Sequence, residues 1–407
     1  MPPAIPPVPD PSARTLLITL TGRDRPGVTS TLFDAASTVG AEVLDLEQIV
    51  VRGHLVLSVL LSPSRDENVL VDRLTRAGEQ VGMQVELSVG HGDNAPRRRG
   101  RAVVVVMGSP LETRHVAAVA RTVAHHGANI DRIHRLSRWP VTTVELDVSG
   151  ADVDGLRRDL ALVSADSRAD IAVAPAGLAR QGARLVVLDV DSTLIQDEVI
   201  ELIAEHAGTA EEVAAVTERA MRGELDFTES LHARVATLAG LPVSVLDEVR
   251  DAVRLTPGAR TFVRTLKLLG FTVAVVSGGF AEVVEPLAAD LGIDHVRANR
   301  LEIEDGRLTG RVVGDVVDRA GKAAALRELA EALGLPLTRT VVIGDGANDL
   351  DMLGAAGLGV AFNAKPLVRE RAHTSVNVPY LDTVLYLLGI SREEIEDAEA
   401  EADALPS

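Results

Sequence analysis

The sequence predicts a mixed α/β protein, in which two small βαββαβ sandwiches precede a larger domain with a parallel sheet. Two observations support this fold class. The order strand, helix, strand, strand, helix, strand occurs near the start of the chain and then recurs. From Gly182 onward, strands that are apolar almost throughout alternate with helices, which is typical of a parallel sheet covered on both faces. The length of 407 residues allows roughly two to four domains.

The first sandwich is predicted at residues 14–92. An apolar run ends in the turn "GRDRPGV", and Leu32, Phe33, Ala36 and Val39 then follow with the spacing of one helical face. The stretch from 42 to 62 gives two strands with a turn at Arg52-Gly53. An amphipathic helix and a final strand complete the βαββαβ order of a ferredoxin-like sandwich.

The second sandwich is predicted at residues 101–176. The segment "HGANIDRIHR" corresponds to "VGAEVLDLEQ" of the first copy and lies 87 residues later. The helix before it ends at Gly127, and a strand and a second helix follow. The polar stretch "GHGDNAPRRRGR" between the copies is interpreted as a linker, and the Pro-rich start as an extended lead-in.

The third domain is predicted at residues 182–390. Its strands "RLVVLDV", "TVAVVSGG" and "TVVIGDG" alternate with helical stretches, as in a Rossmann-like parallel sheet. The acidic residues 391–407 lack an apolar stripe, so we predict a frayed tail there.

Composition excludes several classes of protein. The net charge of -18 argues against a general nucleic-acid binder. The absence of cysteine excludes disulfides, thiolate catalysis and cysteine-ligated metals. No apolar run is long enough to span a membrane, and the first residues do not resemble a secretory signal. We therefore expect a cytoplasmic protein with no membrane partner.

Three predicted strands of the third domain end in polar groups, namely "DVDST" from Asp189, "SGG" from Ser277 and "GDGAND" from Gly344. In an open α/β sheet, ligands bind beyond the carboxyl ends of the strands. Converging carboxylates need a cation, and oxygen ligands without His or Cys favour Mg²⁺. Such a site beside Lys322 suits a phosphoryl group. One aspartate could attack phosphorus, and the other, two residues on, could transfer the proton.

These motifs, in this order, resemble those of the haloacid-dehalogenase-type phosphohydrolases. "DVDSTLIQDEVIELIAEHAG" and "VSGGF" are more narrowly similar to the phosphoserine phosphatases, whose reaction releases serine and phosphate in the last step of serine biosynthesis. The two sandwiches are similar to ACT domains, which are regulatory modules that often bind amino acids. The first carries the turn "GRDRPGV" that is common there, whereas the second has "GSPLET".

The resemblance implies a role for each residue of the three motifs. Asp189 would be the nucleophile and a Mg²⁺ ligand, and Asp191 the general acid/base, with its main-chain carbonyl on the metal. Ser277 and Lys322 would hold the transferring phosphoryl group. The remaining contacts would come from the third motif, with Asp345 on Mg²⁺, Asn348 on the phosphate and Asp349 supporting the metal shell.

The resemblance also implies a helical cap, at about residues 196–260. Glu198 would hold the substrate ammonium and Arg234 its carboxylate, although charged helical residues are more often simply solvated. Met221 and Phe227 would line an apolar lid or, alternatively, belong to the core. Gly278 would contribute a backbone N–H to the substrate.

Two alternatives stay open. A phosphatase with the same chemistry could act on another small phosphomonoester, but a zwitterionic amino acid needs both Glu198 and Arg234. A catalytically inert amino-acid-sensing regulator would not need the full set of Asp189, Asp191, Lys322 and Asp345.

The ACT-like copies predict regulation. We expect serine or another amino acid to bind by the loop after the first strand of each copy, where Gly22, Asp24 and Gly108 are the candidate contacts. Asp24 also suits a plain turn or cap. Exposed sheet edges of such sandwiches often pair between chains, so we expect a homodimer.

Overall fold

The computed structural model describes residues 12–62, 66–92, 100–167, 169–176, 184–222 and 224–404. The Pro-rich start and most of the predicted linker lie outside these residues. The chain divides into two compact units, residues 1–97 and 98–407.

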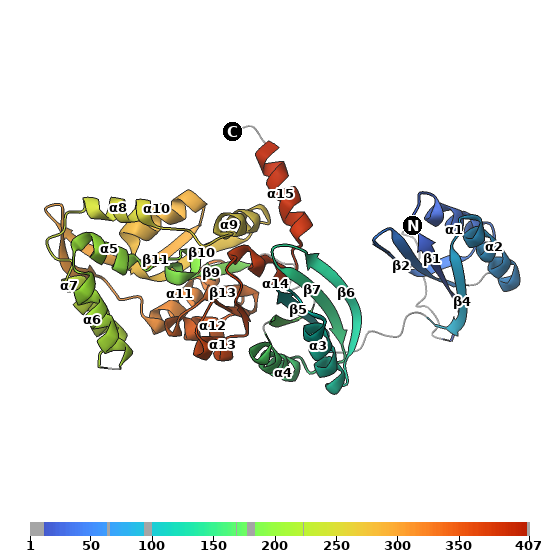
Figure 1. The fold of residues 1–407 in the computed structure, drawn as a ribbon, viewed down its shortest axis with the longest axis horizontal. Coiled ribbons are helices and arrows are strands. Elements are labelled where there is room, and N and C mark those ends of the chain that lie inside the picture. The colour runs from blue at the N-terminus through green and yellow to red at the C-terminus, as the bar shows by residue number, and fades with distance from the viewer. Residues whose placement is uncertain are drawn as a thin grey trace, which may run out of the picture. The chain divides into compact units, whose positions relative to one another are not determined.

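The first unit is a βαββαβ sandwich, as predicted. Its four-stranded antiparallel sheet has the order β2-β3-β1-β4, and two helices cover one face (Figure 1). Leu16, Ile18 and Leu20 alternate along β1 and are fully buried under the helices. The elements are β1 (Arg14–Arg23), α1 (Val28–Ser37), β2 (Glu42–Val51), β3 (His54–Ser62), α2 (Glu67–Gln80) and β4 (Gln84–His91).

The second sandwich repeats this plan within the second unit. Its sheet has the equivalent order β6-β7-β5-β8, which confirms the predicted repeat. The elements are β5 (Ala102–Gly108), α3 (Thr113–His125), β6 (Asn129–Ser137), β7 (Thr142–Ser149), α4 (Val153–Asp166) and β8 (Asp170–Pro175).

The two copies differ in the sheet face that their helices leave uncovered. In the second copy, Val103, Val105 and Met107 on that face belong to the same buried cluster as residues of the C-terminal domain. Burying a side chain of this size contributes about 1.5–3 kcal/mol. Strand β8 also meets β15 (Thr374–Val376), where Asn377 donates a 2.7 Å backbone hydrogen bond to Asp170. A chain that began near Gly182 would lack this sandwich and would expose the apolar residues of the C-terminal domain that pack against it.

The C-terminal domain contains a seven-stranded sheet of order β12-β11-β10-β9-β13-β14-β15. All neighbouring pairs are parallel except β11 and β12, which form a hairpin that the sequence analysis did not identify. The strands not yet bounded are β9 (Leu185–Leu188), β10 (Thr272–Phe280), β11 (His295–Glu304), β12 (Arg307–Val313), β13 (Thr340–Gly344) and β14 (Leu358–Phe362).

Helices cover both faces of this sheet, and four of them form the cap between β9 and β10. Figure 1 shows the cap helices grouped at the end of the domain away from the second sandwich. The cap consists of α5 (Val199–Ala207), α6 (Ala210–Met221), α7 (Phe227–Ala236) and α8 (Ser244–Ala252). The other helices are α9 (Ala259–Leu268), α10 (Ala281–Leu291), α11 (Arg319–Ala332), α12 (Leu350–Ala355), α13 (Pro366–Arg371), α14 (Val384–Leu387) and α15 (Arg392–Ala404).

The prediction of a frayed acidic tail is wrong for residues 392–404, which form α15. The helix packs against α9 and β6 (Figure 1). Ile395 is fully buried, and the Thr261 hydroxyl donates a 2.8 Å hydrogen bond to Glu399. At the helix start, Ser391 and Glu394 exchange cap hydrogen bonds. One buried isoleucine and a cap therefore order a segment that has no apolar stripe.

No helix among the described residues has the length and hydropathy to cross a bilayer.

We predict that Val103→Asp strongly destabilises the second unit. Val103 is 4% exposed, and an unpaired buried charge costs about 3–5 kcal/mol. Leu17→Asp is the matched control, since Leu17 precedes Gly22 as Val103 precedes Gly108 but is 39% exposed. Thermal unfolding followed by calorimetry should show a much larger shift for Val103→Asp. Equal shifts would contradict burial of this face.

Candidate active site

The ends of three adjacent strands form one polar cluster. Strand β9 pairs in parallel with β10 on one side and β13 on the other, so the order of the sheet reverses at β9. Asp189 follows β9, Ser277 lies near the end of β10, and Asp345 follows β13. The sequence therefore brings the three motifs together at the switch point of the sheet, where open α/β sheets bind ligands.

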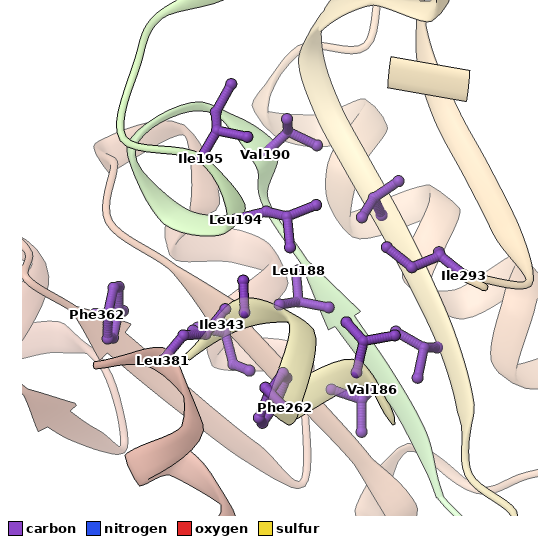
Figure 2. Packing of buried hydrophobic residues seen from close by; sticks show 14 of the residues in the cluster. Val186, Leu188, Val190, Leu194, Ile195, Phe262, Ile293, Ile343, Phe362 and Leu381 are labelled. Atoms are coloured by element: carbon purple, nitrogen blue, oxygen red, sulfur yellow. The ribbon is translucent and has the colours of Figure 1, made fainter. Parts of the chain in front are cut away.

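The turn after β9 directs Asp189 and Asp191 into this cluster. The Asp189 carboxylate accepts a 2.7 Å hydrogen bond from Val190 N–H, and the Ile195 N–H closes the turn onto the Val190 carbonyl. Figure 2 shows Val190, Leu194 and Ile195 in the apolar core near Leu188, so the apolar side chains of the turn hold it against the core. Ser192 takes a left-handed conformation (φ 57°), which is uncommon outside glycine and is often found at functional sites.

Lys322 is the buried cation of the cluster. It lies on α11, is 0% exposed, and places Nζ 2.7 Å from Asp189 and 2.8 Å from Asp349. Burial alone would lower the pKa of Lys322, but the two carboxylates outweigh it and raise that pKa above its usual value. The lysine therefore stays charged and holds the strand ends together.

Three carboxylates converge closely enough to share a metal ion. Oxygens of Asp189, Asp345 and Asp349 lie within 4.8 Å of one another. All three donors are oxygen, and Lys322 offsets only part of their negative charge, which fits a hard divalent cation such as Mg²⁺. Asp349 already binds Lys322 and accepts a 2.9 Å hydrogen bond from Gly346 N–H. The side chain of Asp191 is outside this group.

The environment raises the proton affinity of the catalytic candidates. Burial, together with the Asp349 carboxylate, raises the pKa of Asp189 well above its usual value, against the effect of Lys322. Burial and the Glu198 carboxylate raise the pKa of Asp191 to about 7. Burial and Asp349 raise the pKa of Asp345 to about 6, although the Thr193 hydroxyl donates to it at 3.1 Å. A pKa near 7 suits Asp191 to give and accept a proton.

A cavity of about 480 Å³ lies between this cluster and the cap. Asp189, Asp191 and Asp345 line its base, while Phe227 and Arg234 reach it from α7. That helix starts at a capping box between Asp226 and Glu229, which fixes where Phe227 enters. The other lining residues are Glu198, Ile200, Thr217, Ala220, Leu225, Asp226, Ser230, Leu231, Gly278, Gly279, Phe280, Gly346, Ala347, Asn348 and Lys365.

Glu198 and Arg234 present opposite charges to the cavity. The Ser192 hydroxyl donates a 2.8 Å hydrogen bond to Glu198, whose pKa burial nevertheless raises. Burial lowers the pKa of Arg234, against the effect of Glu198 and Asp191. No carboxylate of a described residue pairs with the Arg234 guanidinium, whose Nε donates to the Ser230 carbonyl at 3.4 Å. Both groups are therefore available to a ligand.

Gly278 and Gly279 line the cavity at points where a side chain would not fit. A side-chain carbon at Gly278 would lie 3.1 Å from the Phe227 ring, and one at Gly279 would lie 3.0 Å from the Asp191 carboxylate. Because glycine has no side chain, the backbone at these positions can lie close to the turn that carries Asp191, called the catalytic turn below, and to Phe227 of the cap.

Not every predicted site residue lines the cavity. Ser277 and Lys322 are fully buried, and the Ser277 hydroxyl accepts a 2.8 Å hydrogen bond from Gly279 N–H. Met221 ends α6, but its side chain is outside what the structure describes. The sequence analysis missed Lys365, an exposed residue after β14 that lines the cavity. Its signal was weak, since a single lysine in a loop is usually solvated.

The predicted regulatory residues lie at the ends of equivalent strands. Gly22 is near the end of β1, and Gly108 ends β5. The Asp24 N–H donates to the Gly53 carbonyl at 2.8 Å, as in an ordinary turn. Side-chain carbons at Gly22 and Gly108 would lie 2.7 Å from Met83 Sδ and 2.9 Å from Leu111 Cα, so both strand ends are closely packed.

Comparison with known proteins agrees with this architecture. Residues 186–354 match the haloacid dehalogenase-like hydrolase family, and residues 14–88 and 101–174 match two ACT domain families.

Relatives span nearly the whole chain. A phosphoserine phosphatase of Streptomyces coelicolor is 59% identical over 393 residues, which cover 96% of each chain. Phosphoserine phosphatase SerB2 of Mycobacterium tuberculosis is 52% identical, over 96% of this chain and 97% of the relative. A crystal structure of a probable phosphoserine phosphatase from Vibrio cholerae superposes with a TM-score of 0.56 at 35% identity, over 74% of this chain and 88% of that one. The chain belongs to the phosphoserine phosphatase family of haloacid dehalogenase-like hydrolases.

Proposed function

We propose that this chain hydrolyses O-phospho-L-serine to L-serine and phosphate through a phosphorylated Asp189. One observation carries the proposal: Glu198 and Arg234 line the same cavity as Asp189 and Asp191. The carboxylate suits the substrate's ammonium group, and the guanidinium suits its carboxylate. Another small phosphomonoester would not need both charges.

Asp189 and Asp191 would divide the chemistry. An Asp189 oxygen attacks phosphorus as the bond from phosphorus to the serine oxygen breaks, and protonated Asp191 donates its proton to that oxygen. Asp191 then takes a proton from water, the water oxygen attacks phosphorus, and the bond to Asp189 breaks to release phosphate. The raised pKa of Asp191, about 7, supports both transfers.

Asp189, Asp345 and the main-chain carbonyl of Asp191 would hold Mg²⁺, with Asp349 in support. Bound Mg²⁺ would offset the negative charge that gathers on the phosphoryl group during transfer. Lys322 would supply further positive charge from its buried position, and Ser277, Gly278 and Asn348 would hold the phosphoryl group and the substrate.

Asp189→Asn should abolish turnover and leave the fold intact, because an amide is a far poorer nucleophile than a carboxylate. Phosphate release from phosphoserine measures turnover, and circular dichroism checks the fold. Asp191→Asn should lose about 10²–10⁴-fold in turnover. Near-normal activity of Asp189→Asn, with deamidation excluded by mass spectrometry, would show that the nucleophile is another residue.

Arg234→Ala should lower kcat/KM strongly for phosphoserine and much less for phosphoethanolamine, which has no carboxylate. A charged hydrogen bond of this kind contributes about 1.5–3 kcal/mol. Equal losses on both substrates would instead assign Arg234 to folding of the cap.

Lys365→Met should lower kcat/KM for phosphoserine by about tenfold at low ionic strength, and the deficit should shrink as salt is added. The reason is charge: five carboxylates line the cavity, against the cations Arg234 and Lys365, while the substrate is an anion. Lys267→Met is the control, because it removes the same charge at the opposite end of β10. A deficit that salt does not change would contradict electrostatic attraction.

We also propose that serine binds at the ACT domains, near Gly22, Asp24 and Gly108, and lowers activity. Such an effector typically couples by about 1–3 kcal/mol, roughly 5–150-fold. A valine at position 108 would displace the loop that packs against it. Serine should therefore inhibit the full chain non-competitively, and Gly108→Val should weaken that inhibition. Purely competitive inhibition of both proteins would leave serine acting only as product.

We also propose that the protein forms a homodimer, in which two copies pair through the first sandwich. Strand β2 is an edge strand, and its Val43, Leu46 and Ile49 are exposed, which supports an interface there. Sedimentation of the full chain and of an Ile49→Lys variant tests this proposal.

A further inference from the structure

The two segments that join the cap to the C-terminal domain lie side by side. Ile195 on the outgoing segment and Leu255 on the returning one form an antiparallel bridge. Gln196 N–H donates to the Arg254 carbonyl at 2.9 Å, and the Gln196 side-chain amide donates to the Leu255 carbonyl at 2.8 Å. The segments therefore form a short ribbon at the only two crossings between cap and sheet within residues 184–280, of which the structure describes all but 223.

An ion pair closes the cap end of this ribbon. The Asp197 carboxylate accepts a 2.8 Å hydrogen bond from Arg254 N–H and a 2.5 Å hydrogen bond from Arg254 Nη2. The Asp197 side chain is 9% exposed, whereas that of Arg254 is 68% exposed. Burial opposes ionisation of Asp197, but the contacts with Arg254 hold its pKa below the usual value.

Asp197 is tied on its other side to the catalytic turn. Ser192 N–H donates to the Asp197 carbonyl at 3.3 Å, and the Ser192 hydroxyl donates to Glu198 at 2.8 Å. Val199, which follows Glu198, begins α5 and donates its N–H to the Asp191 carboxylate at 3.0 Å. Asp197 thus joins the catalytic turn to the returning segment, immediately before the residue that presents its carboxylate to the cavity.

We propose that Asp197 and Arg254 form a clasp that positions Glu198 for the substrate's ammonium group. The proposal rests on the function proposed above and adds Asp197 to it as a positioning residue. Fixing the backbone at 197 fixes the point from which the Glu198 side chain extends, and the Ser192 hydroxyl then orients its carboxylate.

The clasp should affect substrate binding more than stability. An ion pair with one solvent-exposed partner usually adds little to the free energy of unfolding. A carboxylate displaced by even a fraction of its hydrogen-bond length loses much of its interaction with a bound cation. Loss of the clasp should therefore raise KM for phosphoserine while the midpoint of thermal unfolding changes little.

The experiment compares two ligands on the full-length variants Asp197→Ala and Arg254→Met. For phosphoserine, KM should rise about tenfold or more, with a smaller change in kcat. The inhibition constant of 2-phosphoglycolate, which lacks the ammonium group, should stay nearly unchanged. Arg254→Lys, which keeps the charge, should recover part of the loss.

Two controls separate positioning from folding. Asp294→Asn breaks a similar arrangement, since Asp294 accepts from Val273 N–H at 2.9 Å and from Lys267 at 2.5 Å, at the other end of β10. This variant should keep the wild-type KM. In a Glu198→Gln background, Asp197→Ala should cause no further rise in KM, because it acts through Glu198.

Equal weakening of both ligands by Asp197→Ala would overturn the proposal, as would a full additive loss in the Glu198→Gln background. Failure of the proposed function would look different, because the wild-type chain would then release no phosphate from phosphoserine.

Discussion

The buried ion pairs of Lys322 with Asp189 and Asp349 are the interaction on which the site depends. Four aspartates, at positions 189, 191, 345 and 349, meet at the ends of β9 and β13, and their mutual repulsion opposes folding. Lys322 reaches them from the first turns of α11, which Asp318 caps through a 2.7 Å hydrogen bond from Gly321 N–H. Removing Lys322 would leave these buried carboxylates unpaired, which typically costs about 3–5 kcal/mol. The same lysine thus stabilises this edge of the sheet and, under the proposed function, would also attract the anionic phosphoryl group.

Under the proposed function, the cap would recognise the amino-acid part of the substrate. Phe227 and Arg234 come from α7, whereas Glu198 comes from the outgoing segment that adjoins the catalytic turn. The substrate's carboxylate would therefore be held by a cap helix, whereas its ammonium group would be held by the segment that continues from the catalytic turn. The clasp of Asp197 and Arg254 would make Glu198 move with the turn rather than with the rest of the cap.

Much of this arrangement could be predicted from the sequence, for a physical reason. The carboxyl ends of parallel strands meet at one edge, so the motifs at Asp189, Ser277 and Asp345 had to converge once the strands were identified. Glu198 and Arg234 could be proposed only through the family resemblance, because charged residues on helices are normally solvated. Lys365 was missed because the strand before it, Leu358–Phe362, was not identified from the sequence, so its loop was not placed at this edge.

The burial of both faces of the second sandwich's sheet could also have been predicted from the sequence. The strand 102–108 is apolar at successive positions, "AVVVVM", whereas its counterpart in the first copy alternates with threonine. Burial of both faces explains the difference, since β5 lies between its own helices and the C-terminal domain. The helix α15 could not be predicted by periodicity, because its contacts come from one buried apolar residue, Ile395, and from polar side chains such as Glu399.

The central claim is that Asp189 carries the phosphoryl group during turnover. The most direct measurement mixes the full chain with radiolabelled phosphoserine and Mg²⁺, quenches with acid within one turnover, and identifies the labelled peptide. The label should appear on the peptide that contains Asp189 and should be absent from Asp189→Asn. Label on another residue, or phosphate released with no labelled protein at any time, would contradict the mechanism.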